Sequence, residues 1–400
     1  MFPVTDSEEI VRVAAKGDGV TQSGRHVAFA APGDVVLPDG TLQPGPYRST
    51  PPCRHFGRCG GCQLQHLSED ALAAFVRDRV LFAARSQGFE SEVLAPPHLS
   101  PPRSRRRTTL HAAGQGRQAV TGFRELASHR IMDMRECHVL APELFALVAP
   151  LRRFLGATQR GRWAVEIDLT LADQGIDCSL RHFTMDGLNA TEAALAFAQA
   201  NGLARLAVDL GYGAESIYEP QPVTVTLGGM PVPLPSGAFL QATADGEAAL
   251  IDAAQTWLAD AASTADLFAG LGTFAFALPG RVAAYEAARD AHLACRAAAG
   301  RSATRVAAHH RDLFRNPLQV DELAGFDAVL LDPPRAGARE QVARIAESSL
   351  QRVVYISCNP ASWAKDARTL VDAGLRLAEL RPVGQFRWST HVELASLFLR

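Results

Sequence analysis

Short apolar runs alternate with helical segments from about residue 236 to the end of the chain. The runs read TADLFAGLG, RVAAYE, TRVAAH, FDAVLLD, RVVYIS and HVELASLFLR. Strands that alternate with helices in this way usually pair in parallel, with helices on both faces of the sheet. The pattern predicts an α/β fold with a mostly parallel sheet for residues 236–400.

The earlier residues follow another pattern. Residues 10–36 alternate apolar and polar positions between glycine-rich turns, which predicts a short β unit. Residues 37–52 contain five prolines and predict a linker. Helical spacing at 69–87 and 144–157, with a hairpin turning near Gly175, predicts an α+β region.

These changes divide the chain into three parts. We expect a β unit and linker at 1–50, an α+β domain at 51–235 and an α/β domain at 236–400. A chain of 400 residues accommodates two or three domains at about 150 residues each.

The composition is 47% hydrophobic and 20% charged, which is typical of a soluble globular protein. No window approaches the ~18 consecutive apolar residues of a membrane span. The N-terminus, MFPVTDSEEI, lacks the basic and apolar regions of a secretory signal. We therefore expect a cytoplasmic protein, monomeric and without a membrane partner.

Arginine dominates the basic residues. Only Lys16 and Lys365 are lysines, which leaves 38 arginines among the 40 basic residues. Codon bias explains such a ratio, so only clustering can indicate a partner. Residues 101–137 hold eight arginines and three acidic residues in a chain of net charge −2. A local surplus of this kind is typical of phosphate contacts. It predicts RNA contacts at Arg105, Arg106 and Arg107, although a solvated face would look similar.

A glycine loop follows the first strand of the predicted parallel sheet. Gly270 and Gly272 would let the backbone approach a ligand at the start of a helix. Glu286 closes the next strand, where a carboxylate can bind ribose hydroxyls. Asp266 precedes the loop and suits a cationic cofactor, which favours S-adenosylmethionine over a nicotinamide dinucleotide. Acidic residues that merely cap helices are the plain alternative, above all for Asp312 after the third strand.

Two further motifs end neighbouring strands. Asp332 opens Asp-Pro-Pro-Arg, and Cys358 follows the run YIS. Ligands bind at the carboxyl ends of strands in open α/β sheets, and a cysteine in a polar loop there is available as a nucleophile. Its thiolate could add to carbon 6 of uracil and make carbon 5 nucleophilic. Glu393 is the candidate base for the carbon-5 proton.

Three cysteines crowd together at Cys53, Cys59 and Cys62, and Cys137 follows at a distance. Structural zinc sites more often have two separated cysteine pairs, whereas a three-plus-one pattern suits a 4Fe–4S cluster. Zinc and free cysteines remain the alternatives. Cys178 and Cys295 lie in a predicted strand and helix and are interpreted as structural.

Five motifs in this order, FLQ, DLFAGLGTF, LLDPPRAG, YISCNP and HVE, resemble the RNA uracil-5 methyltransferase family of the RumA and TrmA type. The resemblance covers about residues 53–400. It implies a Rossmann-like class I methyltransferase domain with a seven-stranded sheet, Cys358 as nucleophile and Glu393 as base. The implied cofactor contacts are Gln241, Phe268, Gly270, Thr273, Glu286, Asp312 and Asp332. Relatives often carry Asn at the position of Thr273, and a Gln-x-Asn pattern where this chain has Gln241-Ala-Thr243.

The cysteine motif resembles that of the iron–sulfur members of the family. The ribosomal-RNA branch generally has this cluster, whereas the bacterial transfer-RNA enzymes of the TrmA type lack it. This implies 23S ribosomal RNA as partner, rather than DNA, with a target uridine flipped out of its stack. Phe123, His111 and His129 are candidate stacking partners. The N-terminal unit resembles a truncated TRAM module, an RNA-binding β-barrel. Alternative functions are uracil-5 methylation of transfer RNA, amino-group methylation of a purine, and RNA binding by a non-catalytic iron–sulfur protein.

Overall fold

The computed structural model describes residues 7–116, 118–301 and 305–400. Residues 1–6, which contributed to the interpretation of the N-terminus, and Arg117 of the arginine cluster lie outside the described residues. Within the described ranges, no helix is both long and apolar enough to cross a membrane.

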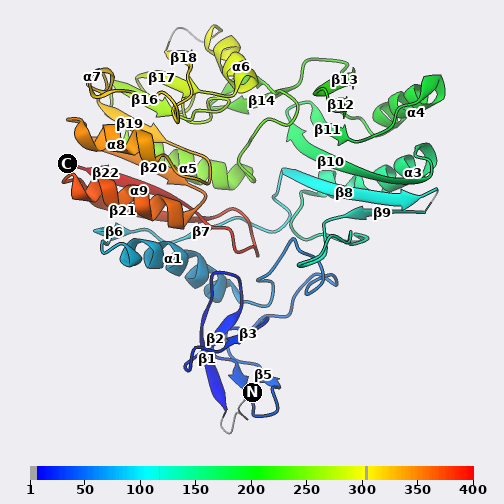
Figure 1. Cartoon of the computed structure of the whole chain (residues 1–400), viewed down its shortest axis with the longest axis horizontal. Helices are drawn as coiled ribbons and strands as arrows, with labels where there is room; N and C mark the ends of the chain where they lie inside the picture. The colour runs from blue at the N-terminus through cyan, green and yellow to red at the C-terminus, as the bar shows by residue number, and fades with distance from the viewer. Residues whose placement is uncertain (1–6, 117, 302–304) are drawn as a thin grey trace.

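The largest sheet is built mainly from the C-terminal residues (Figure 1). Its strands run in the order β18-β17-β16-β19-β20-β22-β21-β6, and β7 also pairs with β21. The bounds are β16 Ser263–Leu267, β17 Arg281–Glu286, β18 Val306–His310, β19 Ala328–Leu331, β20 Arg352–Ser357, β21 Arg376–Gly384 and β22 Glu393–Leu399. Strands β16 to β20 pair in parallel, and β22 is antiparallel to both neighbours.

The predicted count of seven strands is too low, because two short strands from earlier in the chain complete the sheet. β6 (Val93–Leu94) and β7 (His98–Leu99) each pair in parallel with β21. The α/β layer is therefore not confined to residues 236–400. Strands of two residues are too short to show an apolar period, so the sequence pattern did not predict them.

Helices cover both faces of this sheet (Figure 1). Leu72, Val342 and Trp363 belong to one hydrophobic core, and Leu250 and Cys295 belong to another. The helices that carry these residues are α1 Glu69–Ser86, α8 Arg339–Glu347, α9 Pro360–Asp372, α5 Ala244–Trp257 and α6 Arg289–Ala299. The short α7 spans Val320–Leu323.

A second sheet has six strands in the order β13-β12-β11-β10-β8-β9. They are β8 Arg107–Gln115, β9 Gln118–Gly122, β10 Arg162–Ala172, β11 Gly175–Arg181, β12 Arg205–Asp209 and β13 Ala214–Tyr218. Helices α2 Pro142–Ala146, α3 Val148–Thr158 and α4 Gly187–Ala200 share its core. Alternate residues of a strand face opposite sides. Leu110 and Ala112 are buried in that core, while Thr109 and His111 line the cleft described below. A hairpin of β14 (Thr224–Leu227) and β15 (Met230–Pro233) follows.

The N-terminal unit stands apart at one end of the molecule (Figure 1). Its five short strands run in the order β3-β2-β1-β4-β5. They are β1 Glu8–Val13, β2 Gly19–Thr21, β3 His26–Val27, β4 Val35–Val36 and β5 Leu42–Gln43. Within the predicted linker, Gly45 and Arg48 bind the buried Asp34 carboxylate. Residues 42–48 are thus part of the folded unit rather than a free connection.

Candidate active site and RNA cleft

Five polar positions of the largest sheet lie at its carboxyl edge. Glu286 ends β17, while Asp312, Asp332 and Cys358 follow β18, β19 and β20. Glu393 begins β22, which runs antiparallel to β20 with Leu394 opposite Ser357. The antiparallel pairing therefore brings Glu393 to the strand end that carries Cys358. One edge of the sheet gathers groups that the sequence separates widely.

The glycine loop has the conformation that close backbone approach requires. Gly272 has φ +93°, and a Cβ there would lie 2.6 Å from the ring of Phe276. Glu286 accepts hydrogen bonds from the backbone N–H of Gly270 at 2.8 Å and of Ala288 at 2.6 Å. The Glu286 carboxylate thereby ties the loop after β16 to the end of β17. Thr273 lies in the same loop and is half-buried.

An aromatic pair stands beside this loop. Phe268 adopts a positive φ of 65°, which is uncommon for a residue with a side chain. Its ring centroid lies 5.3 Å from that of Phe314. Asp312 accepts hydrogen bonds from the backbone N–H groups of Phe314 and Arg315 at 3.0 and 3.3 Å. Asp312 therefore stabilises the turn that presents Phe314, and it does not cap a helix, since the next one, α7, begins at Val320.

The buried Asp266 and Glu393 each lie near the half-buried Asp332. Burial raises the pKa of Asp332 to about 7. Burial, and then the charge of Asp332, raises the pKa of Glu393 to about 8 and that of Asp266 to about 8. Carboxyl groups in such a setting favour a cationic ligand, because a positive charge would stabilise their ionised forms. This is the electrostatic match that a sulfonium cofactor requires.

The surroundings of Cys358 favour the protonated thiol over the thiolate. Burial raises its pKa to about 11, and the charges of Glu393 and Asp332 add to the effect, while Arg335 opposes it. A nucleophilic cysteine must lose its proton before it attacks. The thiolate would therefore form only when the filled cleft changes these surroundings.

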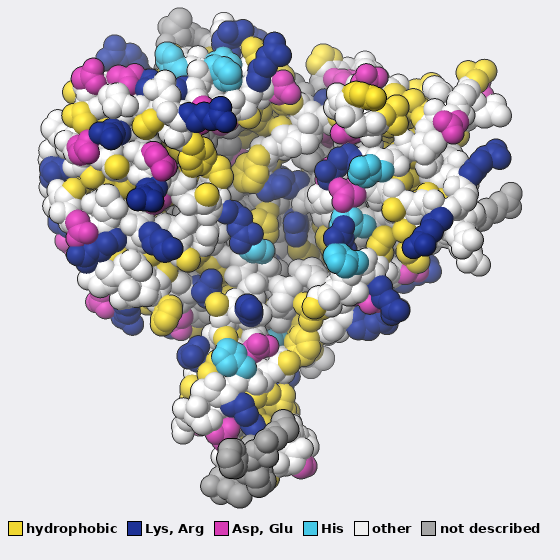
Figure 2. All heavy atoms as spheres, viewed as in Figure 1, with side chains coloured by type: hydrophobic (Ala, Val, Ile, Leu, Met, Phe, Trp, Pro, Cys, Tyr) yellow, Lys and Arg dark blue, Asp and Glu magenta, His cyan; other side chains and the backbone are white. Residues whose placement is uncertain are grey.

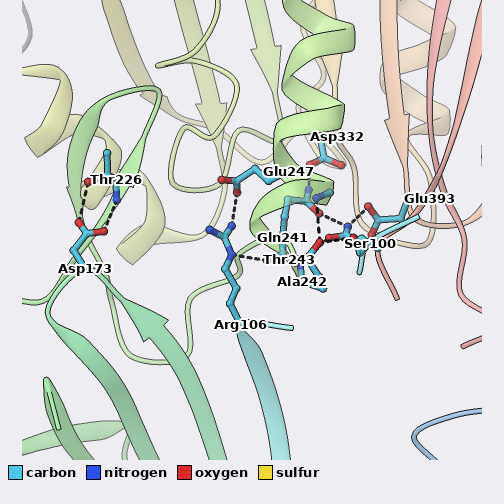
Figure 3. Close-up of polar contacts among 12 residues, drawn as sticks. Ser100, Arg106, Asp173, Thr226, Gln241, Ala242, Thr243, Glu247, Asp332 and Glu393 are labelled. Atoms are coloured by element: carbon cyan, nitrogen blue, oxygen red, sulfur yellow. Dashed lines mark hydrogen bonds and ion pairs between the residues drawn. The ribbon is translucent and has the colours of Figure 1, made fainter. Parts of the chain in front are cut away.

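Polar contacts connect the segment before α5 to the carboxyl edge. Gln241 points toward Asp332 and donates to its Oδ2 at 3.3 Å (Figure 3). The Thr243 hydroxyl accepts from Gly246 N–H at 3.1 Å and caps α5. Threonine is a favourable helix N-cap, so Thr243 has a structural role at the start of α5. A further participant, the buried Gln385, was not predicted from the sequence.

A cleft of about 1060 Å³ lies between the two large sheets. Cys358 and Glu393 line it, together with five arginines: Arg105, Arg107, Arg124, Arg181 and Arg335. Figure 2 shows basic side chains around this hollow. Of the candidate stacking residues, Phe123 and His111 line the cleft, whereas His129 is exposed and is not part of its lining.

Two aromatic residues of the cleft lie against arginines. The guanidinium of Arg107 lies 4.4 Å from the ring centroid of Phe239, and that of Arg105 lies 5.5 Å from the ring of Phe386. Phe239 is 60% exposed. Such paired cationic and aromatic surfaces suit phosphates and unstacked bases. These aromatic residues, like Arg335, were not predicted as RNA contacts.

Arg106 differs from its neighbours. Its Nη2 pairs with Glu247 at 2.6 Å, and its Nε donates to the carbonyl of Gln241 at 3.1 Å (Figure 3). Arg106 does not belong to the cleft lining. Its charge is used within the protein, where it anchors β8 to the segment before α5, so only Arg105 and Arg107 of the predicted trio face the cleft.

The four cysteines of the three-plus-one pattern line one small cavity: Cys53, Cys59, Cys62 and Cys137. Burial raises the pKa of each thiol, to about 11 for Cys53 and about 12 for Cys62. Among the described residues, no three His, Cys, Asp or Glu side chains are grouped so as to hold a metal ion. The cysteines thus face a common space without forming a compact site for a single ion. Cys178 and Cys295 are buried in hydrophobic cores.

Comparison with known proteins identifies the family. The chain is 32% identical to the 23S rRNA (uracil(1939)-C(5))-methyltransferase RlmD of Aeromonas salmonicida, over 89% of this chain and 84% of that protein. The chain belongs to the RNA uracil-5 methyltransferase family. The family model for tRNA (uracil-5-)-methyltransferases matches residues 295–400. An uncharacterized RNA methyltransferase of Zymomonas mobilis is 48% identical, over 98% of this chain and all of that protein.

The fold agrees with that of a family member. The Pyrococcus abyssi tRNA (uracil-54, C5)-methyltransferase, solved with S-adenosyl-L-homocysteine, matches with a TM-score of 0.75 at 22% identity, over 98% of this chain and 99% of that one. The similarity to RlmD and the match to the family model confirm the resemblance inferred from the five motifs. As a uracil-5 methyltransferase, the protein uses S-adenosylmethionine to methylate RNA.

Proposed function

We propose that the protein methylates carbon 5 of one uridine in 23S ribosomal RNA. The observation that carries the proposal is the meeting of Cys358 and Glu393 in the arginine-lined cleft. The similarity to RlmD supports ribosomal RNA as the substrate. Arg105 and Arg107 would contact the RNA backbone, and the target uridine would leave its stack to enter the cleft. We expect the protein to act as a cytoplasmic monomer without DNA as a partner.

The proposed reaction uses Cys358 and Glu393 in sequence. The Cys358 thiolate forms a bond to carbon 6, and the ring electrons move toward the carbonyl oxygen at carbon 4. Carbon 5 then forms a bond to the methyl group as the methyl–sulfur bond breaks, which turns a sulfonium into a neutral thioether. Glu393 takes the proton from carbon 5, the ring double bond re-forms, and the bond from carbon 6 to sulfur breaks.

The cofactor would lie along the carboxyl edge of the largest sheet. Gly270 and Thr273 belong to the loop that would face it, and Glu286 would accept hydrogen bonds from its ribose. Phe268 would pack against the adenine, with Asp312 holding the neighbouring turn. Asp332 and Gln241 would lie between the cofactor and the target base. When bound, S-adenosylmethionine supplies an electrophilic methyl group.

The test of the proposed substrate is mass mapping of 5-methyluridine in RNA from a deletion strain and from its complemented derivative. We expect one 5-methyluridine to disappear from 23S ribosomal RNA and to return on complementation with the wild-type chain but not with Cys358→Ala. Loss from transfer RNA instead would assign the substrate to that class. Unchanged 5-methyluridine in both RNA classes would contradict the proposal.

We further propose that Cys53, Cys59, Cys62 and Cys137 hold a 4Fe–4S cluster. All four line one cavity, and a set of four cysteine thiolates is the ligand set of such clusters. The methyl transfer contains no redox step, so the cluster would act as a structural clamp between the loop at 53–62 and the segment before α2.

Anaerobically purified protein should therefore be brown, with broad absorbance near ~400 nm and about four irons per chain. Replacement of Cys62 by serine should reduce the iron content and the thermal stability together. Cys178→Ser, at a buried cysteine outside the cavity, is the matched control and should keep the iron. Stoichiometric zinc without visible absorbance would contradict this assignment.

A further inference from the structure

Gln385 follows β21 directly, and its side chain is 1% exposed. Its Oε1 accepts hydrogen bonds from the backbone N–H groups of Ala242 and Thr243, at 2.8 and 3.3 Å. A backbone N–H can only donate. These two bonds therefore fix which end of the amide is oxygen, and they direct Nε2 to the opposite side.

The Nε2 amide has two hydrogens, and both are used. One hydrogen bond goes to Oε2 of Glu393, and the other goes to Oε1 of Gln241 at 2.7 Å. Two donors and two acceptor sites complete the hydrogen-bonding capacity of a glutamine side chain. Gln385 has no free polar group for a substrate, so it can act only through its partners.

The hydrogen bond from Gln385 also fixes the orientation of the neighbouring Gln241 amide. Because Oε1 of Gln241 accepts from Gln385, its Nε2 must be the donor to Asp332. Asp332, Gln241, Gln385 and Glu393 are thereby joined across the carboxyl edge of the sheet. Figure 3 shows Gln241, Asp332 and Glu393 in this arrangement. The chain links the segment before α5 to the side chain proposed as the base.

We propose that Gln385 is a positioning residue that orients Glu393 for removal of the carbon-5 proton. The inference rests on the proposed role of Glu393. The donated hydrogen bond holds one carboxylate oxygen of Glu393 toward Gln385, and this constrains where the other oxygen can lie. It also favours the ionised carboxylate, which is the form that accepts a proton.

Other charged groups also face Glu393. Asp332 after β19 raises its pKa, whereas Arg107 at the start of β8 lowers it. Cys358 interacts with the same carboxyl group. Gln385 acts in the same direction as Arg107, through a hydrogen bond rather than a charge. Without that bond, Glu393 should become ionised only at higher pH.

The test is the pH dependence of product release in single turnovers on uridine RNA. Gln385→Met keeps the length of the side chain but removes all four hydrogen bonds. The pH range over which product release by this variant rises should move upward by about one to two pH units. This is the shift expected for one lost hydrogen bond to a charged group. The covalent protein–RNA complex should accumulate at neutral pH, while its rate of formation changes little.

A second variant, Gln385→Glu, keeps the hydrogen bonds accepted from the backbone but removes the hydrogen bond donated to Glu393. A carboxylate can still accept from Ala242 and Thr243 N–H, but it presents an oxygen and a like charge to Glu393. The pH range over which its product release rises should move upward further than that of Gln385→Met. If Gln385→Met fails to fold, this variant, which keeps the backbone anchor, supplies the same measurement.

The matched control is Gln341→Met. Gln341 is also 1% exposed, and its amide accepts from Leu318 N–H at 2.8 Å and donates to the Leu318 carbonyl at 3.2 Å. It lies in α8 and is not part of the cleft lining. This control should lower the thermal stability but leave the pH profile of release unchanged.

A wild-type pH profile in both Gln385 variants would overturn the inference. If Glu393→Gln still slowed release in that case, the proposed base would stand and only the role of Gln385 would fall. If Glu393→Gln also had no effect on release, the proposed function of Glu393 itself would be wrong. The two failures therefore give different results in the same assay.

Discussion

Replacement of Cys358 by alanine should abolish both turnover and the covalent protein–RNA complex. Loss of a nucleophile removes the only route to an activated carbon 5, so we expect turnover to fall by about 10⁴-fold or more. RNA that carries 5-fluorouridine at the target gives the sharpest readout. Methylation of its adduct leaves fluorine on carbon 5, which no base can remove as a proton, so the wild-type enzyme should stay attached to the RNA on a denaturing gel.

The Cys358→Ala variant should show no such band, although its fold and its affinity for the RNA should be preserved. Cys358 is only half-buried, so the loss of one sulfur atom leaves no large internal cavity. Cys178→Ala is the control for a thiol outside the site, and it should still form the complex. Turnover retained by Cys358→Ala would assign the nucleophile to another group or exclude covalent catalysis.

The sequence predicted those parts of the site that lie at strand ends. Parallel strands place their carboxyl ends at one edge, so Glu286, Asp332 and Cys358 could be brought together from the strand pattern alone. Glu393 was a candidate base before the family resemblance was considered, although it begins a strand instead of following one. Only the antiparallel pairing of β22 with β20 explains why this end meets the same edge.

Gln385 could not be predicted, because its contacts are between distant parts of the chain. Its partner Gln241 lies 144 residues earlier, and no spacing rule connects the two. Arg106 is a second residue whose contact could not be predicted from the sequence. Three consecutive arginines look equivalent in sequence, but only Arg105 and Arg107 line the cleft. Arg106, directly before β8, pairs with Glu247 instead.

Short elements were the weakest part of the fold prediction. The proline-rich residues 37–52 contain β5 and contacts to Asp34, which prolines and glycines alone did not indicate. By contrast, the cysteine spacing anticipated that four thiols would face one cavity. That the four thiols hold a cluster stays a prediction.

Replacement of Glu393 by glutamine should cause the covalent protein–RNA complex to accumulate, whereas Cys358→Ala should prevent its formation. Addition of the cysteine and transfer of the methyl group do not require a base at carbon 5, so both should proceed. Removal of the proton should fail, and general-base catalysis contributes about 10²- to 10⁴-fold to such steps. The variant should therefore accumulate a methylated covalent complex on ordinary uridine RNA, where the wild-type enzyme shows little.

The pH dependence of release identifies the group further. Glu393 must be ionised to accept the proton, and burial beside Asp332 raises its pKa to about 8. Release by the wild-type enzyme should therefore rise with pH through this region and level off above it. Glutamine does not ionise, so the residual release of product by Glu393→Gln should not rise with pH in this region.

A loss of folding would prevent formation of the complex altogether, whereas a lost base lets the complex form and persist. Release by Glu393→Gln at the wild-type rate, with the same rise near the same pH, would show that another group takes the proton.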